Sequence, residues 1–173
     1  MEAYSTQQGE GFHTGSKAYF IRLGGCDVGC HWCDTKDSWD PSLHPIQSVK
    51  DISHEAKRQG ASIAVITGGE PTMYNLKPLT AALKEQHIKT HSETAGSYPL
   101  TGEWDWICLS PKKNAPPHKD VFKKASSNAL FTINGIMTTQ SKGFRAAFKI
   151  TPLVSIPYIY WIVGPTAGIG RVD

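Results

Sequence analysis

Short apolar strands alternate with amphipathic helices over most of this chain, and that alternation limits it to few folds. Residues 62–67 form a nearly uninterrupted apolar run, as a parallel strand does when both of its faces are covered. Helices are expected on either side, at 48–59 and 76–86, with Ser48 as the first N-cap and Gly60 as its end. Further strands are expected at 18–23, 88–93 and 106–110. This order predicts an α/β fold with a mostly parallel sheet, whose ligands gather at the carboxyl ends of the strands.

Length and charge exclude some classes of partner. The chain has 173 residues, enough for one domain with a sizeable core, and a formal net charge of +3. Residues 1–125 carry 14 basic and 14 acidic residues, so the whole excess lies in 126–173. The main part of the chain therefore gives no electrostatic reason to expect nucleic acid or a membrane surface as a partner.

Three cysteines, Cys26, Cys30 and Cys33, are spaced C-x3-C-x2-C directly after the first expected strand. Three soft thiolates so close together indicate a metal site, and four cysteines in 173 residues are too sparse for a disulfide framework. A structural zinc or a closed cluster takes four protein ligands, so three ligands on one loop suit a four-iron cluster with one open iron. A zinc knuckle, or a redox cluster completed by Cys108, remains an alternative, although Cys108 lies in an apolar run that predicts a buried strand.

Five sequence blocks narrow the family: STQQGEG at 5–11, FIRL at 20–23, CDTK at 33–36, TGGEP at 67–71 and SPK at 110–112. Together with the cysteines they resemble the 7-carboxy-7-deazaguanine synthase family of the radical S-adenosylmethionine (SAM) superfamily, over about residues 4–125. The resemblance implies an incomplete, TIM-like barrel with a mostly parallel sheet and few helices. It also implies a carbon–nitrogen lyase of queuosine biosynthesis, which converts 6-carboxy-5,6,7,8-tetrahydropterin to 7-carboxy-7-deazaguanine and ammonia.

The resemblance also implies the cofactors and the residues that hold them. A [4Fe-4S] cluster would be bound by the three cysteines, with the amino and carboxylate groups of SAM on the open iron. Glycines beside a carboxylate allow close approach of a ligand and acceptance of hydrogen bonds from an ammonium group. The residues expected to contact SAM are Trp32, Cys33, Asp34, Gly69, Glu70, Ser92, Glu93, Ser110, Pro111 and Lys112.

The pterin substrate and a magnesium ion are assigned to other blocks. Arginine suits a bidentate grip on a carboxylate, which the substrate carries. The residues expected to bind substrate are Gln7, Gln8, Gly9, Glu10, Arg22 and Thr67. Thr35 matches a family position that binds Mg2+, an ion that keeps several waters and needs few protein oxygens; its alternative role is to cap the cluster loop. The histidines His13, His44, His54, His87 and His118 are interpreted as surface residues.

Partners and location follow from the same resemblance. An electron donor such as flavodoxin or ferredoxin and a homodimeric assembly are expected, with no nucleic acid and no membrane. A cytoplasmic location is expected because no apolar leader is found and an oxygen-sensitive cluster needs a reducing compartment. The rival functions are another small radical SAM enzyme, such as a glycyl-radical activase, and a non-catalytic iron–sulfur electron carrier.

The end of the chain departs from the pattern. Residues 126–173 carry one acidic residue, and three prolines interrupt the uncharged stretch 150–170, which argues against a membrane helix. The acidic residues, the alternation and the resemblance all stop at about residue 125. We therefore expect residues 1–125 to form a radical SAM core and 126–173 an atypical C-terminal tail, as a replaced or frame-shifted terminus would give, with weak or no turnover as the consequence.

Overall fold

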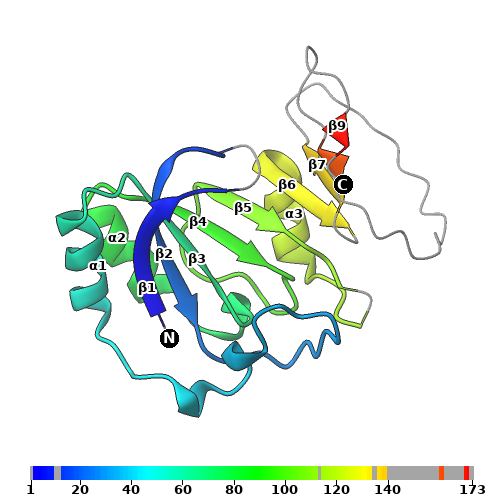
Figure 1. The fold of residues 1–173 in the computed structure, drawn as a ribbon, viewed down its shortest axis with the longest axis horizontal. Coiled ribbons are helices and arrows are strands. Elements are labelled where there is room, and N and C mark those ends of the chain that lie inside the picture. The colour runs from blue at the N-terminus through cyan, green and yellow to red at the C-terminus, as the bar shows by residue number, and fades with distance from the viewer. Residues whose placement is uncertain are drawn as a thin grey trace.

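The computed structural model describes residues 2–9, 13–112, 114–133, 136–139, 160–161 and 170–171, with side chains up to residue 125. Figure 1 shows an open sheet flanked by helices, with α1 and α2 together near one edge and α3 near the other. The main sheet has seven strands in the order β1-β2-β3-β4-β5-β6-β7. They are β1 Glu2–Gln7, β2 Lys17–Leu23, β3 Ile63–Gly68, β4 Lys89–Thr94, β5 Trp106–Leu109, β6 Ala129–Ile133 and β7 Ile136–Thr139. Strands β2 to β6 are parallel, while β1 and β7 pair antiparallel with their neighbours.

The helices are short and follow the strands. They are α1 Val49–Arg58, α2 Lys77–Glu85 and α3 Lys119–Asn128, with 3-10 turns η1 Lys36–Ser38, η2 Pro41–Leu43 and η3 Pro71–Met73. Helix α1 begins as predicted, because the Ser48 hydroxyl accepts a hydrogen bond of 3.2 Å from the Asp51 amide. It ends as predicted too, at Gly60, whose φ of +69° favours glycine.

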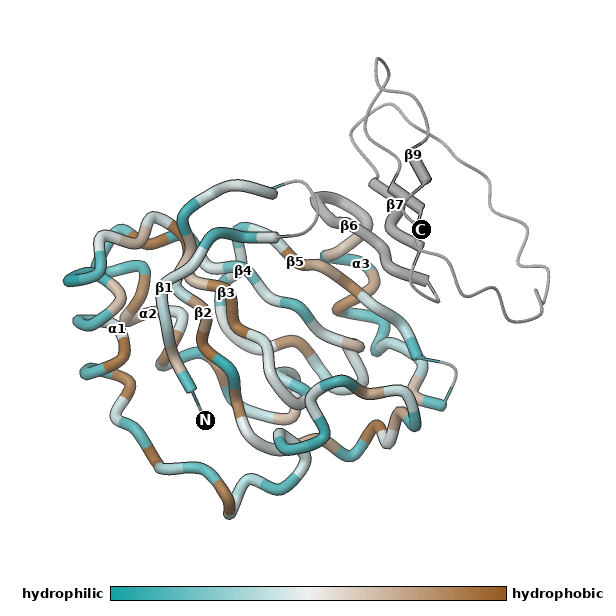
Figure 2. The backbone as a smooth tube through the Cα atoms, viewed as in Figure 1, coloured by the Kyte–Doolittle hydropathy of each residue, from teal (hydrophilic) through white to brown (hydrophobic). Residues whose placement is uncertain are grey.

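The two faces of the sheet differ. Apolar residues follow β2, β3 and β5 in Figure 2, and the main core packs one face of these strands against α1, α2 and α3; its members include Ile21, Ile66, Leu83, Ile107, Leu109 and Val121. A second cluster on the opposite face contains Ala18, Phe20, Ile63 and Val65, and no residue of a described helix. Because side chains alternate along a strand, Arg22 and Thr67 continue this second face to the carboxyl ends of β2 and β3.

Two features of the fold differ from expectation. Strand β1 was not predicted, since its sequence EAYSTQ is polar and its partner is β2. The alternation also does not stop at residue 125: α3 runs to Asn128, and β6 then pairs parallel with β5, with Ile107 opposite Ala129. That expectation was wrong, because the sheet gains two more strands from the segment assigned to the tail.

The remainder of 126–173 is described only at the two-stranded pair β8 Tyr160–Trp161 and β9 Gly170–Arg171. Most of the proposed tail therefore lies outside the described residues, and the division into core and tail stays a prediction. Within the described residues, every helix is too short or too polar to cross a bilayer.

Candidate functional site at the carboxyl ends of β2 to β5

The cysteine loop leaves the carboxyl end of β2. Cys26, Cys30 and Cys33 are half-buried thiols in this loop, and the Cys33 amide donates to the Cys30 carbonyl at 3.1 Å. Burial raises the pKa of Cys26, a backbone hydrogen bond from Val28 lowers it, and the charges of Glu70, Cys33 and Cys30 raise it further.

The TGGEP segment packs backbone to backbone against this loop. The Gly69 amide donates to the Leu23 carbonyl at 2.8 Å, and the Glu70 amide donates to the Gly25 carbonyl at 2.9 Å. A Cβ atom on Gly69 would lie 2.0 Å from the Gly25 oxygen and 3.2 Å from the Cys26 Cβ. Only glycine fits there, and the half-exposed backbone of Gly68 and Gly69 consequently lies beside the first cysteine.

The carboxylate of Glu70 points inward, which differs from its expected role toward an ammonium group. Glu70 is 1% exposed. Its Oε1 accepts from the Thr72 amide at 2.9 Å, from the Thr72 hydroxyl at 2.6 Å and from the Thr94 hydroxyl, and its Oε2 accepts from the Ala95 amide at 2.8 Å. Glu70 thus holds the ends of β3 and β4 together, and the glycine backbone is the part of the motif left to face a ligand.

A hollow of about 380 Å³ next to the loop brings together residues from separate motifs. Arg22, expected to bind substrate, and Thr35, expected to bind magnesium, both line it, as does Gly68, the last residue of β3. The other lining residues are Glu2, Leu23, Gly24, Asp34, Asp37, Ser38 and His44. His44 was interpreted as a surface residue, but it is half-buried here and its Nε2 lies 2.8 Å from the Asp37 carbonyl.

Among the described residues, Arg22 is the one Lys or Arg side chain that lines this hollow, and three carboxylates line it too, those of Glu2, Asp34 and Asp37. The Arg22 Nε lies 3.4 Å from Glu2 Oε1, and its guanidinium lies over the Tyr4 ring at 5.9 Å. Thr67 is the register partner of Arg22 on the neighbouring strand. Thr35 Oγ1 lies 3.7 Å from Cys33 Sγ, so the expected magnesium position adjoins the third cysteine. The hollow thus offers the guanidinium of Arg22 and the hydroxyl of Thr35 to a ligand beside the cysteine loop.

The substrate motif at the end of β1 bends over the helix-free face. Gln8 is buried, and its Nε2 donates to Glu93 Oε1 at 2.9 Å, which joins a residue expected at the substrate to one expected at SAM. Gln7 and Gly9 are exposed. Glu10, also expected to bind substrate, lies outside the described residues.

His13, in the turn between β1 and β2, packs against the sheet. Its ring packs on His91 with centroids 4.5 Å apart and meets the edge of Trp106 at 5.1 Å. His13 is therefore not the surface residue expected from the sequence. His91 is 4% exposed, and burial, with a smaller effect of His13, lowers its pKa to about 4. Burial lowers the pKa of His13 as well, so both rings are neutral near pH 7.

Ser92 does not join the site. Its register partners are Ile66 and Ile107, both in the main core, so its side chain belongs to the helix-covered face. Ser92 is 1% exposed, and its hydroxyl has no hydrogen-bond partner within the described part of the chain. Glu93 takes the opposite face, because neighbouring residues of a strand alternate. Of the two, the structure brings only Glu93 to the helix-free side.

The SPK segment ends β5 beside β4. The Ser110 amide donates to the Thr94 carbonyl at 2.9 Å, and Lys112 Nζ donates to Ser110 Oγ at 2.7 Å. Pro111 is half-buried between them. Trp32 and Asp34, which flank the third cysteine, are exposed, with Trp32 at 58%. The expected SAM residues therefore come from the cysteine loop (32–34), from the segment after β3 (69–70), from β4 (92–93) and from the segment after β5 (110–112).

A zinc ion and a four-iron cluster place different demands on the thiols of this loop. Within residues 2–9, 13–112 and 114–125, no three His, Cys, Asp or Glu side chains converge as ligands of one metal ion. A structural zinc needs four such ligands at one point, whereas a four-iron cluster is ligated at separate iron atoms. Cys108 is half-buried on β5, and β3 and β4 lie between that strand and β2, which disfavours it as a fourth ligand.

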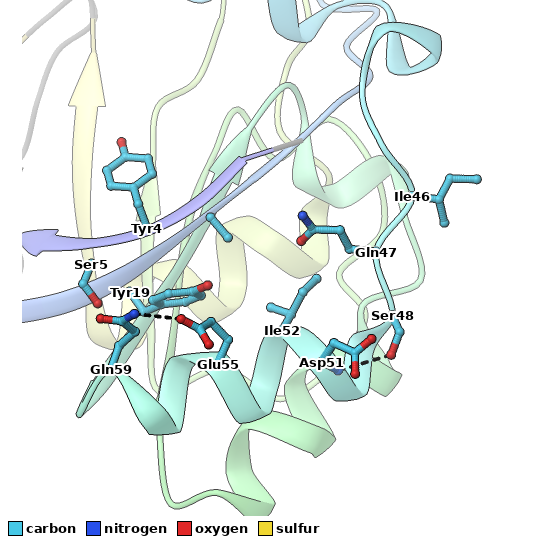
Figure 3. A pocket seen from close by; sticks show the side chains of 11 residues that line it. Tyr4, Ser5, Tyr19, Ile46, Gln47, Ser48, Asp51, Ile52, Glu55 and Gln59 are labelled. Carbon is cyan, nitrogen blue, oxygen red and sulfur yellow. Dashed lines mark hydrogen bonds between the residues drawn. The ribbon is translucent and has the colours of Figure 1, made fainter.

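A larger hollow, of about 650 Å³, lies away from the cysteines between β1 and α1 (Figure 3). Two acidic side chains, Asp51 and Glu55, line it, and Glu55 already accepts hydrogen bonds from Arg58 at 2.6 Å and from Gln59 at 2.7 Å. Tyr19, which also lines it, belongs to the helix-covered core. Of the five sequence blocks this hollow contains only Ser5, and it contains none of the residues expected to bind SAM, magnesium or substrate, so the smaller hollow beside the cysteine loop is the candidate site.

Comparison with known proteins agrees with this geometry. The radical SAM superfamily profile matches residues 20–110. The chain is 52% identical over 125 residues to 7-carboxy-7-deazaguanine synthase of Flavobacterium psychrophilum, covering 72% of this chain and 59% of that protein. It is 48% identical to the Synechocystis synthase over 72% and 60% of the two chains, and 38% identical to the Escherichia coli synthase over 74% and 67%.

A solved structure is similar as well. The crystal structure of QueE from Escherichia coli aligns with a TM-score of 0.65 at 32% identity, covering 76% of this chain and 68% of that one. The chain spans about 60% of the length of the first two relatives.

Proposed function

The chain belongs to the radical SAM superfamily and, within it, to the 7-carboxy-7-deazaguanine synthase family, and on that premise we propose that it is a carbon–nitrogen lyase. Its substrate would be 6-carboxy-5,6,7,8-tetrahydropterin, and its products 7-carboxy-7-deazaguanine and ammonia. The observation that carries this proposal is the hollow beside the cysteine loop, which Arg22, Thr35 and Gly68 all line. Its volume of about 380 Å³ lies in the range of small-molecule sites.

Cys26, Cys30 and Cys33 would hold a [4Fe-4S] cluster by three irons, and the glycine backbone at 68–69 would orient SAM beside it. Bound together, these groups supply one-electron hydrogen-abstraction chemistry. Arg22 would bind the substrate carboxylate, and Thr35 would share a Mg2+ ion with that same carboxylate. Gln8, whose side chain is fixed by Glu93, would lie against the pterin ring.

Three further features are proposed because they are typical of the family. The electron donor would be a flavodoxin or ferredoxin, the assembly a homodimer and the location the cytoplasm. A glycyl-radical activase remains the rival enzyme, but a pocket built around an arginine and a hydroxyl suits a small carboxylate better than a protein backbone.

Anaerobic reconstitution with iron and sulfide, followed by assay with SAM, a reductant and the carboxypterin, tests the proposal. Wild type should form the deazaguanine product and should change its EPR signal when SAM is added. A cluster whose EPR signal does not change when SAM is added would indicate an electron carrier. SAM cleavage that yields no pterin product would favour the activase.

Two variants locate the substrate. Arg22→Ala should lower kcat/KM for the pterin by about 10- to 150-fold, as expected when a hydrogen bond to a charged group is lost, while SAM cleavage without substrate persists. Thr35→Ala should reduce the stimulation by Mg2+ rather than the activity measured without it. Arg58→Ala is the matched control, since Arg58 pairs with Glu55 on the exposed side of α1. Equal losses in Arg22→Ala and Arg58→Ala would remove Arg22 from the substrate site.

A further inference from the structure

Two tyrosines outside every motif reach the cysteine loop. Tyr74 follows η3, and its hydroxyl donates to the Gly24 carbonyl at 2.5 Å. A Cβ atom on Gly25 would lie 2.2 Å from that hydroxyl oxygen, so the Tyr74 side chain occupies the space that glycine leaves open. Gly25 has a φ of +106°, which fixes the direction of the chain as it enters Cys26.

Tyr98 reaches the same loop from the other side. It lies after β4, and its hydroxyl donates to Asp27 Oδ2, directly after Cys26. Its amide donates to the Thr72 hydroxyl at 3.3 Å, and that hydroxyl donates to Glu70 at 2.6 Å. One residue thus joins the cysteine loop to the buried carboxylate that holds the ends of β3 and β4.

We propose that Tyr74 and Tyr98 are positioning residues that fix Cys26 against Gly69 from both sides, and so set the geometry of a cluster relative to its ligand. This inference rests on the proposed function. The two hydroxyls bond to the residues at 24 and 27, so they bracket Cys26 alone. Cys30 and Cys33 are braced mainly by their own turn. Loss of either bond should therefore loosen one of three thiolates and leave the others in place.

The test uses the full reconstituted chain and the single-atom changes Tyr74→Phe and Tyr98→Phe. Each variant should lose iron to a chelator about 2- to 12-fold faster than wild type, the range for one intramolecular hydrogen bond. The EPR signal of the SAM-bound cluster should also change in shape, since one cluster ligand is held less firmly. Tyr19→Phe is the matched control, because Tyr19 is buried on the helix-covered face.

A second pair of variants separates positioning from general stability. Asp27→Asn keeps an acceptor for Tyr98 and should retain slow iron loss, whereas Asp27→Ala should behave like Tyr98→Phe. The double variant Tyr98→Phe/Asp27→Ala should be no worse than either single one, because both remove the same bond.

The outcomes distinguish the two proposals. Suppose that wild type assembles a SAM-responsive cluster, but Tyr74→Phe and Tyr98→Phe lose iron as slowly as Tyr19→Phe and give the same EPR signal. That result would overturn the positioning role of the two tyrosines and would leave the proposed function unaffected. A wild-type protein that binds no cluster would overturn both.

Discussion

Replacing Glu70 tests the claim that the TGGEP motif is held by its own carboxylate. Glu70 is 1% exposed, and its two oxygens accept four hydrogen bonds, three on Oε1 and one on Oε2. In Glu70→Gln the amide oxygen should take the Oε1 position, since that position satisfies three donors. The amide nitrogen then faces the Ala95 amide, so one hydrogen bond is replaced by two opposed donors.

The cost follows from those contacts. A buried donor that loses its acceptor costs about 1–3 kcal/mol, so Glu70→Gln should lower the free energy of unfolding by about 2 kcal/mol. Glu70→Ala removes the acceptor of two backbone amides and two hydroxyls and also leaves a void. We expect it to cost about 4–5 kcal/mol, at the upper end for a single substitution.

Urea unfolding of the full chain, followed by tryptophan fluorescence, measures both values. Glu85→Gln is the control, since Glu85 is exposed at the end of α2. Unfolding midpoints of Glu70→Gln and Glu70→Ala that match that control would refute the reasoning. Such a result would instead support the role expected from the sequence, in which the Glu70 carboxylate contacts a ligand.

Three further predictions concern other parts of the site. Cys30→Ala should lower bound iron and abolish SAM cleavage, while Cys108→Ala keeps both; iron loss in Cys108→Ala would contradict the three-cysteine assignment. Gly69→Ala should destabilise the fold by about 1–3 kcal/mol through overpacking, measured by urea unfolding against Gly9→Ala, where nothing lies within 4 Å of the added methyl. His91, with its pKa lowered to about 4 from 6.5, contributes stability that is complete above pH 6.5 and is lost as the pH falls toward 4. Between pH 7 and 5 wild type should therefore lose about 2 kcal/mol more than His91→Gln, and parallel pH profiles would show that burial does not hold His91 neutral.

Much of the fold was predictable because its signals are local. The apolar run of β3 and the Ser48 cap of α1 depend on neighbouring residues only, and both are confirmed. Strand β1 was missed because its polar residues form a strand only through pairing with β2. Strand β6 was missed because the change in composition near residue 125 was interpreted as the end of the alternation.

In the candidate site, too, the residues in local motifs were predictable, whereas the contacts between distant segments were not. Arg22 and Thr35 were found through their motifs, and the structure places both in one hollow. Ser92 was assigned together with Glu93, although alternation along a strand lets only one of them face the helix-free side. The Glu70 carboxylate points inward because it accepts hydrogen bonds from Thr94 and Ala95, which lie 24 and 25 positions further along the chain. Local sequence patterns do not predict partners at that separation. Tyr74 and Tyr98 were missed for the same reason.

The bond between Tyr98 and Asp27 spans 71 positions of the chain, which has a consequence for biosynthesis. At about 5–20 residues per second, a ribosome needs about 4–14 seconds to proceed from Asp27 to Tyr98. During that interval the three cysteines have left the peptidyl transferase centre, but the strands and side chains that hold their loop do not yet exist. Iron delivered co-translationally would meet an unconstrained thiol peptide open to oxidation and to the wrong metal. The contact between Asp27 and Tyr98 therefore becomes available to the cysteine loop only after β4 and the segment that follows it have been synthesised.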